Sequence, residues 1–255
     1  MLPEPRVLDQ IASYTLLSEQ DLFAELSESV QWEELGKGRI GATLAKPDAA
    51  DLVPLVRTTT RYATPAQRFR TVHDLLAQQI QTCADLPIAF NNALIETYTN
   101  AYATMGSHSD QALDLADDSF IAVFSCYRNP EPIPPRRLIV EPKGSTDKLE
   151  IPLTHNGIVV FPVAANRRLK HKIVLGAPAR TAENQWLGVT FRTSKTLIAF
   201  REGQPYLPTG IPLTQADDDQ QREFFQLRRR ENNETDFTYP PLTYTVSASD
   251  LIPPI

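Results

Sequence analysis

Two of the four histidines in this chain have neighbours that suit them to hold a metal ion. His108 lies two positions before Asp110, so on an extended strand the imidazole and the carboxylate point to the same face. His171 opens a later apolar run, HKIVL, and can supply a second imidazole. Two histidines and one carboxylate form the facial triad that holds Fe(II) and leaves further coordination positions open. The sequence therefore predicts a metal site at His108, Asp110 and His171.

A fixed cation suited to an anionic cosubstrate lies further along the chain. Arg192 stands in the segment TFRTSK, and Ser194 follows two residues later on the same strand face. A guanidinium offers a carboxylate a bidentate fork that lysine lacks. Arg192 and Ser194 are therefore expected to bind a dicarboxylate, with a structural ion pair as the alternative role of Arg192.

Helical patterns flank a β-rich centre. Apolar residues recur at helical spacing in 17–34, a second helix is predicted to start at Thr64, and a third is predicted to run from Thr214 to Arg230. His73, inside the second helix, is expected on the surface or in helix packing. Short apolar runs typical of strands lie at 120–127, 137–142, 148–153, 157–163, 171–175 and 186–200. This order favours an α+β protein built on a β-sandwich or a jelly roll (double-stranded β-helix).

The 255 residues are expected to form a single domain in three parts. Residues 1–87 are predicted as a helical N-terminal extension, 88–200 as the jelly-roll core, and 201–255 as a C-terminal helix with an extended tail. A net charge of −6 argues against a protein that binds a phosphate backbone. Two distant cysteines exclude a disulfide framework and a zinc-thiolate site. We find no signal peptide and no transmembrane run, so a cytoplasmic protein without a membrane partner is expected.

The candidate metal site and its surroundings resemble the iron(II)/2-oxoglutarate-dependent oxygenases, and in detail their AlkB-like branch. The resemblance covers about residues 88–195. It rests on an H-x-D pair, a later histidine and a strand ending in T-F-R, here His108 to Asp110, His171, and Thr190 to Arg192. In that branch a tyrosine ten residues before the H-x-D pair contacts 2-oxoglutarate, and Tyr98 holds this place.

Three positions depart from the AlkB-like pattern. The asparagine two residues before the tyrosine is here Glu96, and the arginine six residues before the T-F-R arginine is here Trp186. An asparagine two residues before the threonine is here Gly188. The cosubstrate is therefore not expected to be bound as it is in the DNA-repair members.

The resemblance implies a reaction as well as a site. The three protein ligands would hold Fe(II), 2-oxoglutarate would take two of the open positions and O2 the third, and a C–H bond of the substrate would be oxidised. Relatives that halogenate replace the carboxylate ligand with a small residue. Because Asp110 is present, hydroxylation, or desaturation or cyclisation begun in the same way, is favoured over halogenation.

The sequence is compatible with several classes of substrate. The acidic chain and the missing second arginine favour a small molecule, such as an amino acid or a natural-product intermediate. The alternatives are a nucleic-acid dealkylase, in which the basic runs 136–137, 167–171 and 228–230 contact phosphates, and an enzyme acting on a protein side chain. A non-catalytic jelly-roll binding module is a further alternative.

Some residues are expected near the substrate. In the superfamily that the chain resembles, N-terminal material often lies over the active site, which points to Arg57, Arg61 and Tyr62. Tyr102 follows the expected cosubstrate tyrosine, and Arg168 stands just before the expected ligand His171. Arg168 is expected to contact an anionic substrate.

Overall fold

The computed structural model describes residues 6–131, 133–176 and 184–255. The predicted α+β class is confirmed, since the structure consists mostly of antiparallel strands with few helices. The helices are η1 (Val7–Gln10), α1 (Leu22–Glu28), α2 (Thr71–Cys83), α3 (Val163–Asn166), α4 (Asp218–Asn233) and η3 (Ala248–Leu251). The strands are β1 (Ala12–Thr15), β2 (Glu33–Gly36), β3 (Arg39–Ala45), β4 (Val53–Pro54), β5 (Gln67–Arg68), β6 (Asn92–Tyr98), β7 (Phe120–Tyr127), β8 (Arg136–Pro142), β9 (Leu149–Pro152), β10 (Gly157–Pro162), β11 (Leu169–Leu175), β12 (Trp186–Arg192), β13 (Leu197–Arg201), β14 (Gln204–Tyr206), β15 (Thr214–Gln215) and β16 (Tyr244–Thr245).

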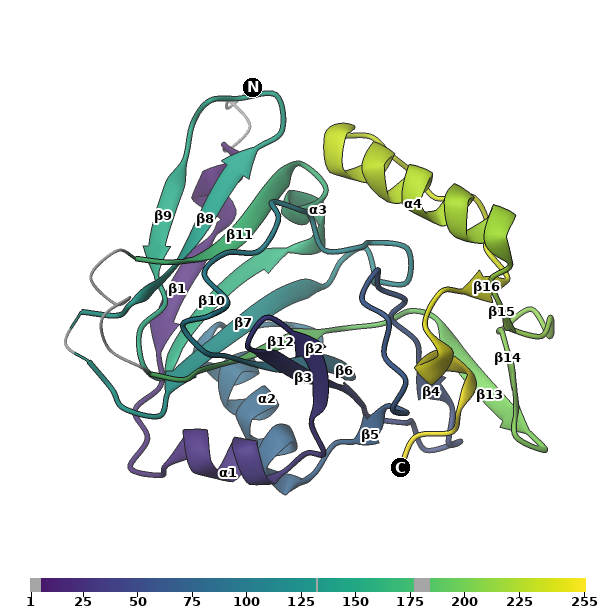
Figure 1. The fold of residues 1–255 in the computed structure, drawn as a ribbon, viewed down its shortest axis with the longest axis horizontal. Coiled ribbons are helices and arrows are strands. Elements are labelled where there is room, and N and C mark those ends of the chain that lie inside the picture. Colours follow the sequence, from purple (N-terminus) through teal and green to yellow (C-terminus); the bar gives the residue numbers. More distant parts are fainter. Residues whose placement is uncertain (1–5, 132, 177–183) are drawn as a thin grey trace.

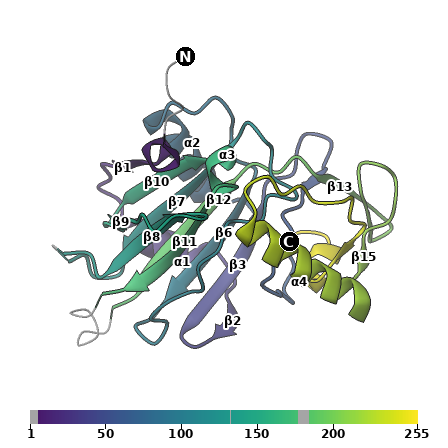
Figure 2. The ribbon, with the colours of Figure 1, turned by 90° about the horizontal axis from the view of Figure 1, so that it is seen from above.

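The largest sheet is built from strands that lie between residues 12 and 192 (Figures 1 and 2). Its order is β1-β10-β7-β12-β6-β3-β2, with β5 running parallel to β3 at one end. A second antiparallel sheet has the order β11-β8-β9, and β14-β13-β4 and β15-β16 form two small ones. In Figure 1 the strands β8, β9 and β11 lie on one side of the large sheet, and α1 and α2 lie on the other.

Successive side chains on a strand of the large sheet point to opposite faces, and each face packs into its own core. On β7, Phe124 and Cys126 pack with the helices α1 and α2, whereas Ile121 and Val123 pack against the second sheet. Both faces of β7 are therefore covered, which explains why FIAVFSCY is a continuous apolar run and does not alternate. The strands β6, β12 and β11 border the core between the two sheets.

The N-terminal region is only partly helical. The predicted extension 1–87 contains α1 and α2, but it also contributes β1 and β3 to the large sheet, which the sequence analysis did not predict. The predicted helix 17–34 is shorter than expected, because α1 ends at Glu28 and β2 follows. The predicted strand 186–200 is divided into β12 and β13.

The predicted start of the second helix at Thr64 was wrong. The Gln67 side chain accepts a hydrogen bond from Gln31 N (2.8 Å) and donates one to Gln31 O (2.7 Å), which holds this segment extended as β5. The helix α2 begins only at Thr71. The third helix, α4, begins at Asp218 with Asp217 as its N-cap, a few residues later than predicted.

His73 joins α2 to α1 and is fully buried, so it has a packing role. Its Nδ1 accepts a hydrogen bond from Arg70 N (3.0 Å), and its Nε2 lies 2.7 Å from the Ser29 hydroxyl. Because that hydroxyl donates to Leu26 O (2.7 Å), Nε2–H is the donor to Ser29 Oγ. Burial lowers the pKa of His73 to about 4, so the ring is neutral in the folded protein.

We expect this histidine to make stability depend on pH. Its pKa is about 6.5 in the unfolded chain and is lower in the fold, so its contribution is complete above pH 6.5 and is lost as the pH falls toward 4. From about pH 7 to about pH 5, the unfolding free energy of the wild type should fall by about 2 kcal/mol more than that of His73→Gln. Urea unfolding at both pH values measures this difference. Equal losses in the two proteins would show that His73 does not cause the pH dependence.

Candidate metal centre

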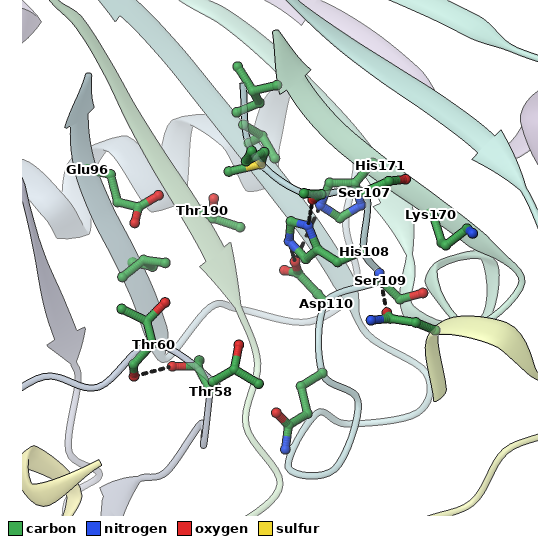
Figure 3. A pocket seen from close by; sticks show the side chains of 18 of the residues that line it. Thr58, Thr60, Glu96, Ser107, His108, Ser109, Asp110, Lys170, His171 and Thr190 are labelled. Carbon is green, nitrogen blue, oxygen red and sulfur yellow. Dashed lines mark hydrogen bonds and ion pairs between the residues drawn. The ribbon is translucent and has the colours of Figure 1, made fainter. Parts of the chain in front are cut away.

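The structure brings His108, Asp110 and His171 together, as the sequence predicts. One nitrogen or oxygen atom from each side chain lies within 4.8 Å of the others, and this group can hold a metal ion. His108 and His171 form an isolated antiparallel bridge, in which His108 N donates to His171 O (3.0 Å) and His171 N donates to His108 O (2.7 Å). His108 thus lies in a loop that touches β11 at this pair, and Figure 3 shows the three side chains converging.

Asp110 presents its two oxygens to different partners. Oδ1 lies 3.4 Å from His171 Nε2 and 3.7 Å from His108 Nε2, and Oδ2 accepts a hydrogen bond from Arg192 Nε (2.6 Å). Burial alone would raise the pKa of Asp110, but Arg192 and the two imidazoles hold it well below its usual range. The carboxylate therefore stays ionised, as a metal ligand must be.

The imidazole of His108 is also in the form that coordinates a cation. Burial lowers the pKa of His108 to about 4, and the neighbouring His171 adds to this effect. His108 Nδ1 bonds Gly106 O (2.8 Å), which makes Nδ1 the protonated nitrogen and leaves Nε2 facing Asp110. Two nitrogens and one carboxylate oxygen on the same side of the site are a donor set that fits a divalent ion such as Fe(II).

Asn166, at the end of α3, holds the backbone of Asp110 from one side. Asp110 N donates to Asn166 Oδ1 (2.8 Å), and Asn166 Nδ2 donates to Asp110 O (2.7 Å). Both residues are buried, so these bonds are shielded from water. The pair fixes the ligand backbone before any ion binds.

The helix α4 holds the same loop from the other side. Asn232 Oδ1 accepts from Ser109 N (2.9 Å), Arg228 Nη2 donates to Ser109 O (2.9 Å), and Glu231 Oε1 accepts from Ala112 N (2.8 Å). The sequence predicts this helix but gives no indication of its contact with the metal loop, because the partners are 119 or more positions apart. The C-terminal helix therefore helps to position the loop that carries the candidate ligands His108 and Asp110.

A cavity of about 630 Å³ opens beside the three candidate ligands. Tyr98 and Tyr102, two residues expected from the sequence, line it together with Arg192. The Tyr98 hydroxyl, however, donates a hydrogen bond to Glu96 Oε2 (2.5 Å). Arg192, which the sequence assigns to a dicarboxylate, here forms the ion pair with Asp110, its alternative role.

Other expected site residues lie elsewhere. The Ser194 hydroxyl donates to Leu55 O (2.5 Å), away from the cavity. Tyr62 is buried behind the cavity wall, and Arg61 bonds Gln221 Oε1 (2.8 Å) on the face of α4. Arg168 is exposed and does not line the cavity, although Lys170 on the neighbouring strand does. The cavity lining therefore does not include four residues that the sequence predicts at the site: Ser194, Arg61, Tyr62 and Arg168.

Trp186 fills part of the wall where the sequence resemblance places an arginine. Its Nε1 donates to Ser125 Oγ (2.7 Å), and its ring lies over Gly188. A Cβ atom added at Gly188 would lie 2.1 Å from the ring of Trp186. The two departures from the family pattern thus depend on each other, because the indole fits only over a residue without a side chain.

We expect Gly188→Ala to displace the indole and cost about 1–3 kcal/mol of stability. The change should alter tryptophan fluorescence, and in a Trp186→Leu background the same Gly188→Ala change should cost much less stability in urea unfolding. Unchanged fluorescence and stability in Gly188→Ala would contradict this packing.

Among the described residues, no helix has both the length and the apolar character needed to cross a membrane. Comparison with models of known protein families and with curated proteins gave no match.

Proposed function

We propose that this protein is an Fe(II)/2-oxoglutarate-dependent oxygenase that oxidises a C–H bond of a small molecule. The observation that carries the proposal is the convergence of His108, Asp110 and His171 at the wall of a cavity large enough for a small ligand. All three donors lie on one side of the site, so the cavity side is left for other ligands. The sequence resemblance to this superfamily supports the same conclusion.

The arrangement of the sheets supports a jelly-roll core in this proposal. The β11-β8-β9 sheet packs over β7, β10 and β12 of the large sheet, with apolar residues of both sheets between them. One ligand, His171, comes from the second sheet, and Arg192 comes from the large one. The metal would therefore lie at the opening between two facing sheets.

The protein residues would hold, charge and orient the reacting groups. His108, Asp110 and His171 would hold the iron, and Arg192 would keep Asp110 ionised and in place. When bound, the iron and 2-oxoglutarate would supply the electrons that activate O2 for oxidation of the substrate. Thr58, Thr60 and Tyr102 line the cavity and would contact the substrate.

The test is succinate formation by purified protein with Fe(II), ascorbate and 2-oxoglutarate. We expect iron-dependent succinate from the wild type and from His155→Ala, a histidine outside the cluster, but none from His108→Ala. Amino acids and methylated oligonucleotides, added separately, would show which substrate class stimulates the reaction. Metal uptake without any succinate would leave the metal site but refute the oxygenase; no metal uptake would favour a binding module.

A further inference from the structure

A second charged group lies in the same cavity, on β3 and β6. Glu96 Oε1 accepts hydrogen bonds from Arg39, with Arg39 Nε at 2.8 Å, and Arg39 Nη2 also lies 3.3 Å from Thr60 Oγ1. Figure 3 shows Glu96 and Thr60 on one side of the cavity and His108 and Asp110 on the other, with Thr190 between them in this view. The group faces the metal ligands across the space that a cosubstrate would fill.

Hydrogen bonds orient the Arg39 guanidinium but do not occupy all of its N–H donors. Glu96 and Thr60 take its Nε and Nη2, and Nη1 has no hydrogen-bond partner in the part of the chain that the structure describes. Burial would lower the pKa of Arg39, but Glu96 raises it overall, so the guanidinium is always charged. A guanidinium has five N–H donors. The side chain therefore keeps donors for an anion in the cavity that it lines.

A neighbouring hydroxyl also lacks a partner. Tyr62 is 2% exposed, and its hydroxyl makes no hydrogen bond to the described residues. A Cβ atom added at Gly41 would lie 3.0 Å from this hydroxyl. Gly41 and Arg39 are two positions apart on β3, so they are on the same face of the strand. Burial raises the pKa of Tyr62 well above its usual value, so the group remains a donor. This hydroxyl is therefore a buried donor behind the cavity wall that carries Arg39, without a partner among the described residues.

The strand register gives Arg39 a specific place in the sheet. Arg39 on β3 and Trp186 on β12 are both paired with Tyr98 on the strand β6 between them. The two side chains are thus at the same level of the sheet, on either side of Tyr98. Arg39 therefore carries a positive charge at this level of the sheet, whereas Trp186 is uncharged.

We propose that Arg39, oriented by Glu96 and Thr60, binds the distal carboxylate of the 2-oxo dicarboxylate cosubstrate. This inference rests on the proposed function. Arg192 is paired with the candidate metal ligand Asp110, whereas Arg39 is paired with Glu96, which is not one of the candidate ligands. Arg39 and Arg192 balance Glu96 and Asp110, and a divalent ion balances a dicarboxylate. These charges sum to zero, which lowers the cost of burying them, and Lys170 and Arg229 add positive charge at the cavity wall.

The experiment compares ligands with and without the distal carboxylate. Co(II)-loaded protein is titrated by calorimetry with 2-oxoglutarate and with 2-oxopentanoate, which lacks that carboxylate. The wild type should prefer 2-oxoglutarate. Arg39→Gln should weaken 2-oxoglutarate binding about 10- to 100-fold and leave 2-oxopentanoate binding nearly unchanged. Arg137→Gln, at an exposed arginine paired with Glu150, is the matched control and should bind like the wild type.

A second variant separates binding from folding. Arg39→Gln with Glu96→Gln removes both charges, so no buried carboxylate is left unpaired, and 2-oxoglutarate binding should still be weak. Recovery of wild-type affinity in this double variant would overturn the inference, because Arg39 would then only neutralise Glu96. Equal losses for both ligands in Arg39→Gln would overturn it as well. If the wild type binds Co(II) but neither ligand, the proposed function itself fails.

Discussion

Asp110→Ala should abolish metal binding and also destabilise the fold. The first effect follows because the only carboxylate of the candidate ligand group is removed. The second follows because Arg192, 6% exposed, loses its ion-pair partner and stays buried as an uncompensated charge. Removing one partner of a buried pair costs about 3–5 kcal/mol. Co(II) binding followed by visible absorption and urea unfolding measure the two effects separately.

His171→Ala provides the comparison for this prediction. It removes a ligand without removing a charge partner of Arg192, so it should abolish Co(II) binding at a much smaller cost in stability. Asp110→Ala with Arg192→Met should recover stability but not metal binding. A Co(II) spectrum in Asp110→Ala that matches the wild type would contradict the assignment of Asp110 as a ligand.

Arg57→Met should be among the most destabilising substitutions outside the metal site. Arg57 is 3% exposed, and its guanidinium bonds both oxygens of Asp114, with Nη2 to Oδ1 at 2.9 Å and Nε to Oδ2 at 3.1 Å. Its Nη1 also donates to Leu242 O (2.8 Å) and Tyr244 O (3.0 Å). The variant would leave a buried carboxylate and two carbonyls unpaired, at a cost of about 3–5 kcal/mol. The urea midpoint measures this loss.

The sequence suggests that Arg57 lies near the substrate, but the structure gives it a buried ion pair with Asp114. A residue that meets the substrate would change the substrate constant with little effect on unfolding. Replacing both partners, Arg57→Met with Asp114→Leu, should recover part of the lost stability, because no single charge is then left buried. A stable Arg57→Met protein with an altered substrate constant would restore the first interpretation.

The candidate ligand group could be predicted because residue types and short spacings in the sequence identify it. An H-x-D pair fixes two ligands by itself, and His171 stands out because the other histidines lie in a helix or a turn. The strands 120–127 and 157–163 were predicted nearly to their ends, since both faces of each are buried and their runs are strongly apolar. Patterns of this kind depend only on neighbours in the chain.

The remaining part of the site depends on contacts that no local pattern records. Arg39 precedes Glu96 by 57 positions, and only the pairing of β3 with β6 brings them together. Ser194 and Arg192 share a strand face in the sequence argument, but β12 ends at Arg192, so alternation no longer places Ser194 in the cavity. Arg61 was expected over the site, yet it bonds a helix that the sequence could not position.

The final residues of the described chain are bound to a segment beside the cavity, which affects the order of folding. Arg68 N donates to Ile255 O (2.7 Å), Ile255 N donates to Ala66 O (3.0 Å), and Ser249 N donates to Tyr62 O (3.1 Å). The segment 57–68, which includes the cavity residues Thr58 and Thr60, leaves the ribosome long before these partners are made. This wall of the cavity therefore closes only after residues 242–255 have been synthesised. A ribosome-bound chain that stops before them should hold the large sheet but not the finished cavity.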